Sequence, residues 1–245
     1  MSWRNLFLKK TSPLLQLRQQ DGGYRLWNPS TQTEIELSEL GSLTGTSFDI
    51  QLGLDSHQVL TIAPLEGLSL SEYPLYWKNT FQQLFPDQVW DIVLPDAVIH
   101  QTALITARPY EVAVALKPFD KSIRWCRPAW AVGFFHAQRQ LTALQRAGLS
   151  IWIWEEHHQF LWLERSLATQ QWKKAVIRYF PEEISDKNNY LQEYVAQHCD
   201  EQQLASILHV RVQNNPSHQH ITLHHYSLDG KKLVTSAPDV WRPTL

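Results

Sequence analysis

The sequence predicts an α/β protein built from two halves, each a β-meander followed by helix and strand units. Three observations favour this fold class. The 245 residues are 43% hydrophobic and 19% charged, a globular composition with room for one large domain or two small ones. Short runs rich in β-branched and aromatic residues occur in groups of three, once near the N-terminus and again after residue 150. Segments with helical spacing and further strands follow each group.

The first half is expected to span residues 1–148. Its first two strands are joined by a hairpin turn at Asp21-Gly22-Gly23, because glycine tolerates the positive φ that a tight turn requires. The expected strands of this half are Leu14–Arg18, Tyr24–Trp27, Glu34–Leu37, His57–Ile62, Val89–Leu94, Thr102–Ala107, Glu111–Leu116 and Ile123–Cys126.

Two helices are expected in the first half. Ser69 and Glu72 have the spacing of a capping box at the start of a helix whose regular part Pro74 restricts to its later residues. The second helix is expected over Ala129–Ala147, where apolar residues recur at helical spacing, and Gly148 stands at the position of a C-cap.

The second half is expected to span residues 149–245 and to begin with another meander. A turn at Glu155-Glu156-His157-His158 joins its first two strands, and Asp229-Gly230 closes a hairpin near the C-terminus. A helix is expected over Asn188–His198. The expected strands are Ile151–Trp154, Phe160–Glu164, Trp172–Tyr179, Ile207–Val212, Ile221–Tyr226 and Lys231–Thr235.

This element order is duplicated without any duplication of the sequence. A repeated β-β-β-α-β unit is typical of two ribonuclease-H-like halves that together form an actin-like fold. The alternative is an ordinary α/β protein with two unrelated halves, and the order of elements alone leaves both open.

The segment from residue 124 to residue 179 resembles proteins of the actin-like PilM and GspL group. The resemblance lies in the order and hydrophobic texture of four stretches and includes no diagnostic motif. They are Arg127–Phe135 (RPAWAVGFF), Ser150–Glu155 (SIWIWE), Phe160–Glu164 (FLWLE) and Gln171–Arg178 (QWKKAVIR). The opening Met1–Lys10 is similar in character to that of several pilus platform proteins.

The resemblance implies a non-enzymatic scaffold of type IV pilus or type II secretion assembly, located in the cytoplasm at the face of the inner membrane. Such a scaffold would bind the cytoplasmic segment of a bitopic membrane partner, for example by adding a strand to an exposed sheet edge. Many members of the group keep the fold without nucleotide chemistry, so the resemblance implies no cofactor and transfers no site residue.

The distribution of glycine also predicts that the chain does not bind ATP productively. Actin-like ATPases hold phosphates with the turns of their two meanders, where glycine lets backbone N–H groups approach oxygen closely. Asp21-Gly22-Gly23 could serve as the first such turn, although an ordinary hairpin explains it as well. No glycine lies between Gly148 and Gly230, and the carboxylates of Glu155 and Glu156 in the second turn would repel a phosphate. A nuclease of the ribonuclease H type is excluded because the first strand has no acidic residue.

An enzymatic alternative rests on the motif HHxxxDG. His224, His225, Asp229 and Gly230 match the signature of condensation-type acyltransferases, in which the second histidine is a general base. The motif lies near the C-terminus of a chain much shorter than such enzymes, and a strand leading into an Asp-Gly turn needs the same residues. An acyltransferase or hydrolase is therefore kept as the second hypothesis.

Other reactive side chains have plainer explanations. His218, His220 and His224 would share one face of a strand and could bind zinc, but a solvated strand face explains them equally. Cys126 and Cys199 could each be a nucleophile paired in space with a histidine, but buried structural cysteine is commoner. We expect no metal site.

The aromatic residues suggest two contact surfaces. Trp152 and Trp154 share one face of a strand whose other face carries isoleucines, and with Trp162 they could form either core or an open patch for a partner. Trp3, Leu6 and Phe7, beside basic residues, could contact a membrane surface, and a loose terminus is the alternative.

Charge and hydropathy exclude further classes. With 22 basic and 24 acidic residues, the chain lacks the overall field of a nucleic-acid-binding protein, so a nucleic-acid-linked function is the least favoured hypothesis. The longest uncharged apolar stretch has eleven residues, Pro128–Gln138, against roughly 20 for a membrane-spanning helix. The opening lacks the apolar core of a signal peptide, and two cysteines make no disulfide framework.

Overall fold

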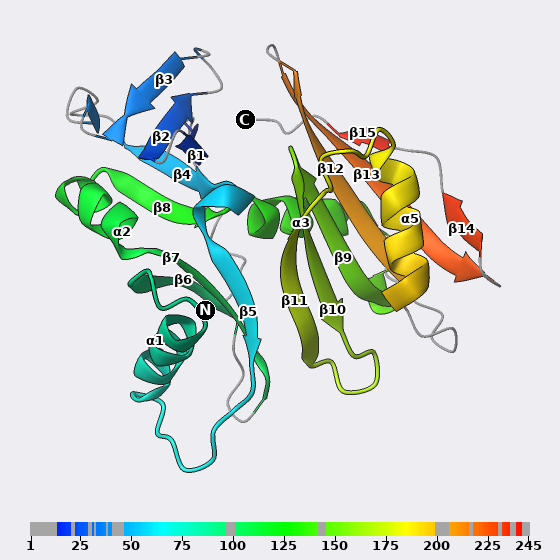
Figure 1. Cartoon of the computed structure of the whole chain (residues 1–245), viewed down its shortest axis with the longest axis horizontal. Helices are drawn as coiled ribbons and strands as arrows, with labels where there is room; N and C mark the ends of the chain where they lie inside the picture. Colours follow the sequence, from blue (N-terminus) through cyan, green and yellow to red (C-terminus); the bar gives the residue numbers. More distant parts are fainter. Residues whose placement is uncertain are drawn as a thin grey trace.

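The computed structural model describes residues 14–20, 23–28, 31, 33–37, 39–40, 47–96, 101–141, 146–198, 206–215, 218–229, 232–235 and 239–241. Their strands form three sheets, which we call the first sheet, the small sheet and the second sheet. Figure 1 shows the first and small sheets on one side of the molecule and the second sheet on the other, with helix α3 between them.

The first sheet has the strand order β3-β2-β1-β4-β8. Its strands are β1 (Leu14–Gln20), β2 (Gly23–Asn28), β3 (Thr33–Glu36), β4 (Phe48–Leu52) and β8 (Ile123–Pro128). The first three form an antiparallel meander, β4 pairs parallel with β1, and β8 pairs parallel with β4. A meander whose first strand is followed outward by two parallel strands is the arrangement of a ribonuclease-H-like half.

The second sheet repeats this order as β11-β10-β9-β12-β13 and continues with β14, while β15 also pairs with β13. Its strands are β9 (Leu149–Glu156), β10 (Gln159–Arg165), β11 (Trp172–Tyr179), β12 (Ser206–Asn215), β13 (His218–Asp229), β14 (Lys232–Thr235) and β15 (Asp239–Trp241). After helix α5 (Lys187–His198), β12 returns parallel to β9. The repeat departs from the first sheet at β13, which is antiparallel to β12.

The small sheet, with strand order β5-β7-β6, is inserted between β4 and β8. It comprises β5 (Gln58–Ile62), β6 (Trp90–Asp96) and β7 (Ala103–Pro109). The remaining helices are η3 (Leu54–Ser56), α1 (Tyr73–Leu84), α2 (Tyr110–Leu116), η4 (Lys117–Phe119) and α3 (Ala129–Gln140). Within the described part of the chain, no helix has both the length and the hydropathy to cross a bilayer.

Most predicted elements are confirmed, but two were wrong in type or extent and two strands were missed. The missed strands are β4 and β15. The segment Glu111–Leu116, predicted as a strand, forms α2, because Val112 and Leu116 are spaced by one helical turn and are both buried. Helix α3 ends at Gln140 and not at Ala147, since Leu141 has an extended backbone.

Ser69 and Glu72 do contact each other, but in the turn before α1, because Glu72 is itself the N-cap residue and makes no side-chain cap hydrogen bond to the helix. The Glu72 carboxylate accepts hydrogen bonds from the backbone N–H of Ser69 at 2.8 Å and from the Ser69 hydroxyl at 2.6 Å. Helix α1 begins at the next residue, Tyr73. The domain boundary between residues 148 and 149 stays a prediction, although the strands of the first and small sheets precede it and those of the second sheet follow it.

The two large sheets bury their faces differently. Leu15, Leu17 and Ile50 of the first sheet pack with α2 residues on one face, the apolar face. The opposite face carries polar and aromatic side chains, and we call it the polar face; it includes Gln16, Arg18, Trp27, Asp49, Trp125 and Arg127. In the second sheet both faces are apolar, one packed on α3 and the other on α5.

Candidate functional site

A polar cluster, which we call the sheet junction, lies between the ends of β1 and β9. It consists of Arg18 near the end of β1, Asp55 in η3, Glu156 at the end of β9 and His157 in the following turn. Strands β1 and β4 run parallel in the first sheet, and β9 and β12 run parallel in the second. The carboxyl ends of both pairs face this cluster. In an open α/β sheet, ligands bind outside the carboxyl ends of the strands, which makes the junction the candidate site.

Glu156 joins the two halves of the chain. Its Oε2 accepts a hydrogen bond from the backbone N–H of Leu54 at 3.2 Å, across 102 positions of sequence, and one from the indole N–H of Trp154 at 3.4 Å. Burial raises the pKa of Glu156, which these two donors partly offset. The side chain at the end of β9 therefore accepts a hydrogen bond from a backbone N–H of the first half of the chain.

Asp55 adds a second acidic group to the junction. Burial, and then the neighbouring Glu156 carboxyl group, raise the pKa of Asp55 to about 6, while a hydrogen bond from the Gln19 backbone, and then His157 and Arg18, act in the opposite direction. The Asp55 Oδ1 atom and the Arg18 Nε atom are buried without a hydrogen-bond partner among the described residues. The acidic pair at this point is Asp55 and Glu156, not the predicted Glu155 and Glu156, because Glu155 lies on the opposite face of β9.

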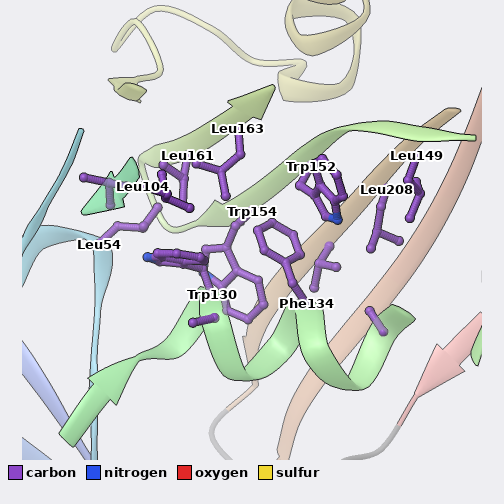
Figure 2. Close-up of a cluster of buried hydrophobic side chains, with 14 of the residues drawn as sticks. Leu54, Leu104, Trp130, Phe134, Leu149, Trp152, Trp154, Leu161, Leu163 and Leu208 are labelled. Carbon is purple, nitrogen blue, oxygen red and sulfur yellow. The ribbon is translucent and has the colours of Figure 1, made fainter. Parts of the chain in front are cut away.

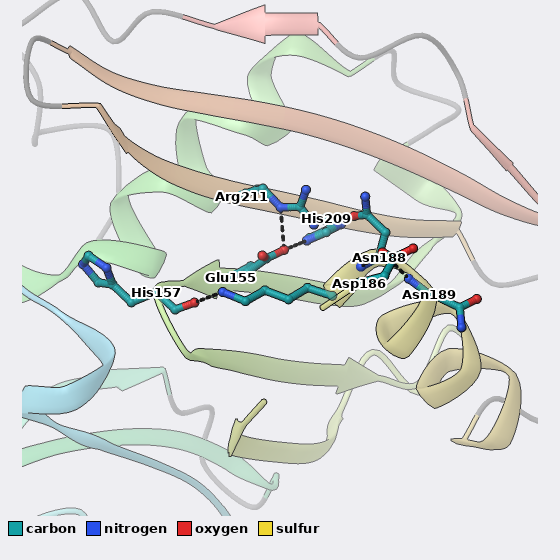
Figure 3. Close-up of polar contacts among 8 residues, drawn as sticks. Glu155, His157, Asp186, Asn188, Asn189, His209 and Arg211 are labelled. Carbon is teal, nitrogen blue, oxygen red and sulfur yellow. Dashed lines mark hydrogen bonds and ion pairs between the residues drawn. The ribbon is translucent and has the colours of Figure 1, made fainter. Parts of the chain in front are cut away.

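The turn after β9 is built without glycine. His157 has a φ of 50°, in the left-handed region that glycine usually supplies. The Lys187 ammonium at the start of α5 donates a hydrogen bond to the His157 carbonyl oxygen, as Figure 3 shows. A side chain thus supports a backbone conformation that glycine would adopt at no cost, and the turn presents no glycine amide to a ligand.

His57 connects the first sheet to helix α3. The indole N–H of Trp130 donates to His57 Nε2 at 2.9 Å, so this nitrogen is unprotonated, and Nδ1–H donates to the carbonyl oxygen of Gly53 at 2.7 Å. Burial lowers the pKa of His57 to about 4. The imidazole is therefore neutral at physiological pH and acts as a two-ended structural link.

Helix α3 is in turn fitted to the second sheet. Gly133 faces the six-membered ring of Trp154 so closely that an added Cβ atom would overlap it. Figure 2 shows Trp154 and Trp152 pointing from β9 toward α3, where Trp130 and Phe134 meet them. The stretch RPAWAVGFF, singled out in the sequence, therefore forms the contact between α3 and the second sheet.

A second polar cluster lies on the opposite face of β9 and was missed by the sequence reasoning. Glu155 Oε2 contacts His209 Nε2 at 3.0 Å and accepts from Arg211 Nε at 2.7 Å, and Arg211 also donates to Asn188 of α5 (Figure 3). Burial opposes ionisation of Glu155, but the contacts with His209 and Arg211 lower its pKa overall. The alternation of His209 and Arg211 on one strand was the available signal.

The tryptophans proposed for partner binding are buried. Trp152, Trp154 and Trp162 are 5%, 3% and 0% exposed. The first two pack on α3 and Trp162 packs on α5, because β9 and β10 are central strands covered on both sides. The reading of Ile151 and Ile153 as core is confirmed, and the open aromatic patch is corrected to core.

The other predicted residues fall into three groups. Cys126 is a free thiol whose pKa is raised to about 11 by burial, and Arg108 donates to its sulfur at 3.2 Å, so it is not an activated nucleophile. In the described residues no group of three metal-binding side chains is found. Trp3, Leu6, Phe7, Asp21, Gly22, Cys199 and Gly230 lie outside the described residues.

The described part of the HHxxxDG motif, from His224 to Asp229, lies on β13. In the backbone register, His224 pairs with His209 and His225 with Leu208 of β12, while Asp229 pairs with Lys232 of β14. The predicted antiparallel pairing of these last two strands is therefore confirmed. His218 and His220 lie on the same strand, opposite the far end of β12. A catalytic role of His225 stays a prediction.

No model of a protein family and no curated protein matches the sequence. Among solved structures, the cytoplasmic domain of EpsL, an inner membrane component of the type II secretion system of Vibrio cholerae, is similar with a TM-score of 0.44 and 10% identity, over 83% of this chain and 84% of that one. A Bacteroides thetaiotaomicron protein with an actin-like ATPase fold and unknown function is similar at 0.39 and 12% identity, over 76% and 77%.

A third similar structure is the PilM–PilN type IV pilus biogenesis complex, at a TM-score of 0.36 and 8% identity, over 64% of this chain and 48% of that one. The fold itself follows from the strand orders: this is an α/β chain of actin-like architecture, with two ribonuclease-H-like sheets that meet at their carboxyl ends.

Proposed function

We propose that this chain is a non-enzymatic, actin-like scaffold that binds the cytoplasmic segment of a membrane-anchored partner in pilus or secretion assembly, at the inner face of the inner membrane. The observation that carries the proposal is the Glu156 carboxylate bonded to the Leu54 N–H at the sheet junction. It occupies, with the chain's own side chain, the position between two meanders where an actin-like ATPase would need free amides for phosphate.

Three further contacts support a closed junction. Lys187 supports the glycine-free turn, His57 bonds Trp130, and Trp154 fills the notch at Gly133. Separating the two sheets around a nucleotide would break the Glu156–Leu54 hydrogen bond, worth about 1 kcal/mol, and would disturb the packing of α3. A junction held closed by the chain's own side chains suits a docking platform better than a nucleotide-driven hinge.

The partner class comes from the sequence resemblance in residues 124–179. The descriptions of the similar EpsL and PilM–PilN structures name the same two kinds of assembly. We keep the scaffold as the first proposal and the enzyme acting through His225 as the alternative.

Two measurements test the proposal. Isothermal titration of the full chain with Mg-ATP is expected to give no binding at micromolar concentration, and a micromolar affinity would contradict the closed junction. Affinity purification from detergent-solubilised membranes of the source cell is expected to retain a protein with a single membrane span. Retention of none, together with turnover of an acyl substrate that His225→Ala abolishes, would favour the enzyme.

A further inference from the structure

The polar face of the first sheet combines buried polar side chains with tryptophans that lie outside the hydrophobic clusters. Gln16 and Asp49 at its centre are buried, at 6% and 5% exposure, and Arg18 and Arg127 are partly buried. Trp27 and Trp125 belong to none of the hydrophobic clusters that the described residues form. No described helix packs on this face through hydrophobic contacts. Aromatic and arginine side chains on such a surface are typical of the centre of a protein interface.

The contacts on this face run along the sheet. Arg124 holds Asp49 with two hydrogen bonds, Arg25 pairs with Glu34 at 3.1 Å, and Arg18 donates to Gln16 at 2.8 Å. The Arg18 guanidinium also lies over the Trp27 ring, 5.5 Å from its centroid. These pairs use Asp49 and Glu34, so these two carboxylates are already matched by arginines.

Arg127 is left without a matching acidic group. No hydrogen bond or ion pair joins its side chain to another residue in the described part of the chain. It stands on β8 beside Gln51, in register with the middle of the sheet, and burial lowers its pKa. A partly desolvated guanidinium without a carboxylate costs stability, so its presence on a sheet face calls for a group that satisfies it.

We propose that the polar face is the docking surface for an acidic segment of the partner protein. Arg127 binds a carboxylate of this segment, and Trp27 and Trp125 pack on apolar side chains of the same segment. A guanidinium binds a carboxylate through two parallel hydrogen bonds, which favours an acidic occupant over a neutral one. Strand β8 pairs only with β4 among the strands, so a segment lying along it also meets an outer strand of the sheet. This inference rests on the proposed scaffold function.

The first test uses a defined probe. A fluorescein-labelled ten-residue peptide of alternating glutamate and leucine is titrated with the full chain by anisotropy, beside a lysine–leucine counterpart and vesicles of phosphatidylglycerol. The acidic peptide is expected to bind and the basic one not. Arg127→Ala is expected to weaken binding about tenfold or more, and Arg127→Lys less, because lysine keeps the charge without the fork.

The matched control is Arg178→Ala. Arg178 is an exposed arginine of β11 in the second sheet, without an ion pair to a described residue, and its removal is expected to change affinity less than twofold. Urea midpoints of both variants confirm that the fold is kept. Equal loss in the control, no binding of the acidic peptide, vesicle binding without peptide binding, or a chain dimer that Arg127→Ala dissolves would each overturn the inference.

The second test separates the docking surface from the scaffold function itself. A photo-crosslinking residue at position 51 is irradiated during the membrane purification, and the crosslinked peptide is identified by mass spectrometry. The expected product is a net-negative segment of the membrane partner, absent in the Arg127→Ala background. If the wild type retains no partner, the scaffold function fails; if it retains one equally with Arg127→Ala and no crosslink forms, only the docking surface fails.

Discussion

The two large sheets share a strand order and differ in what covers them. Strand β1 of the first sheet reads LLQLRQQ and buries leucines on one face only, whereas β9 reads LSIWIWEE and is buried along nearly its whole length. Helices α3 and α5 cover both faces of the second sheet, while α2 packs on one face of the first. The same topology thus gives one sheet that is a core and another with a face available for recognition.

The largest expected effect comes from comparing the stability cost of removing a tryptophan from each of the two sheets. Trp152→Ala should reduce the free energy of unfolding by about 3–5 kcal/mol, because it empties a fully packed site under α3. Trp125→Ala, outside every described cluster, should cost less than about 1 kcal/mol. Urea denaturation followed by circular dichroism measures both; similar losses would mean that the polar face is also core.

The link of α3 to the first sheet can be weakened with acid. The unfolded His57 takes up a proton near pH 6.5, but the folded one does so only near pH 4, so stability should fall as pH decreases between these values, by up to about 3 kcal/mol. His57→Gln keeps an acceptor for Trp130 without titrating. Comparing urea midpoints of the wild type and this variant from pH 7 to pH 4 isolates the histidine; parallel curves would exclude it as the acid-sensitive link.

The fit of α3 to the second sheet depends on the glycine notch. Gly133→Ala should destabilise the chain by about 1–3 kcal/mol, because the new methyl group overlaps the Trp154 ring, despite the better helix propensity of alanine. In the double variant with Trp154→Phe, part of this loss should be recovered, which a double-mutant cycle of unfolding free energies detects. Additive losses would show that α3 does not depend on this contact. Gln138→Ala, on the same helix, is the control.

The smallest effect concerns the junction where the sheets meet. Since the pKa of Asp55 is raised to about 6, its ionisation is unfavourable in the folded state, and stability from this group falls as pH rises from about 4 through 6. Asp55→Asn should therefore be more stable than the wild type above pH 6, by about 1 kcal/mol, and equal to it near pH 4. Thermal unfolding at both pH values measures this; lower stability of the variant at pH 7 would mean that the hydrogen bond from the Gln19 backbone and the charges of His157 and Arg18 outweigh burial.

How much the sequence predicts also differs between the sheets. The long aromatic strands of the second sheet were predicted within a few residues, because strand alternation is a local signal. Strand β4 (FDIQL) was missed because it is short and carries Asp49 and Gln51 on the face that stays polar. Helix α2 was taken for a strand because a run of alternating valine and alanine fits both periods.

For the candidate site, the sequence predicted only which features are missing for phosphate binding. The absence of glycine and the presence of acidic residues in the second turn were legible, and Glu156 lies where a phosphate would be opposed. Its partner Leu54 is 102 positions away and contributes a backbone amide, for which no residue type is a signal. The polar face was also not legible, because its arginines come from strands whose register only the sheet defines.

The insertion of the small sheet has a consequence for biosynthesis. Strand β4 emerges from the ribosome with Leu52, but its outer neighbour β8 begins only at Ile123, after the whole small sheet has been translated. Throughout this interval, the nascent chain has an incomplete sheet in which the outer edge of β4 is unpaired. Pairings between distant segments also form slowly. A small sheet that folds early and shields β4 would protect the growing polypeptide from aggregation until the last strand arrives.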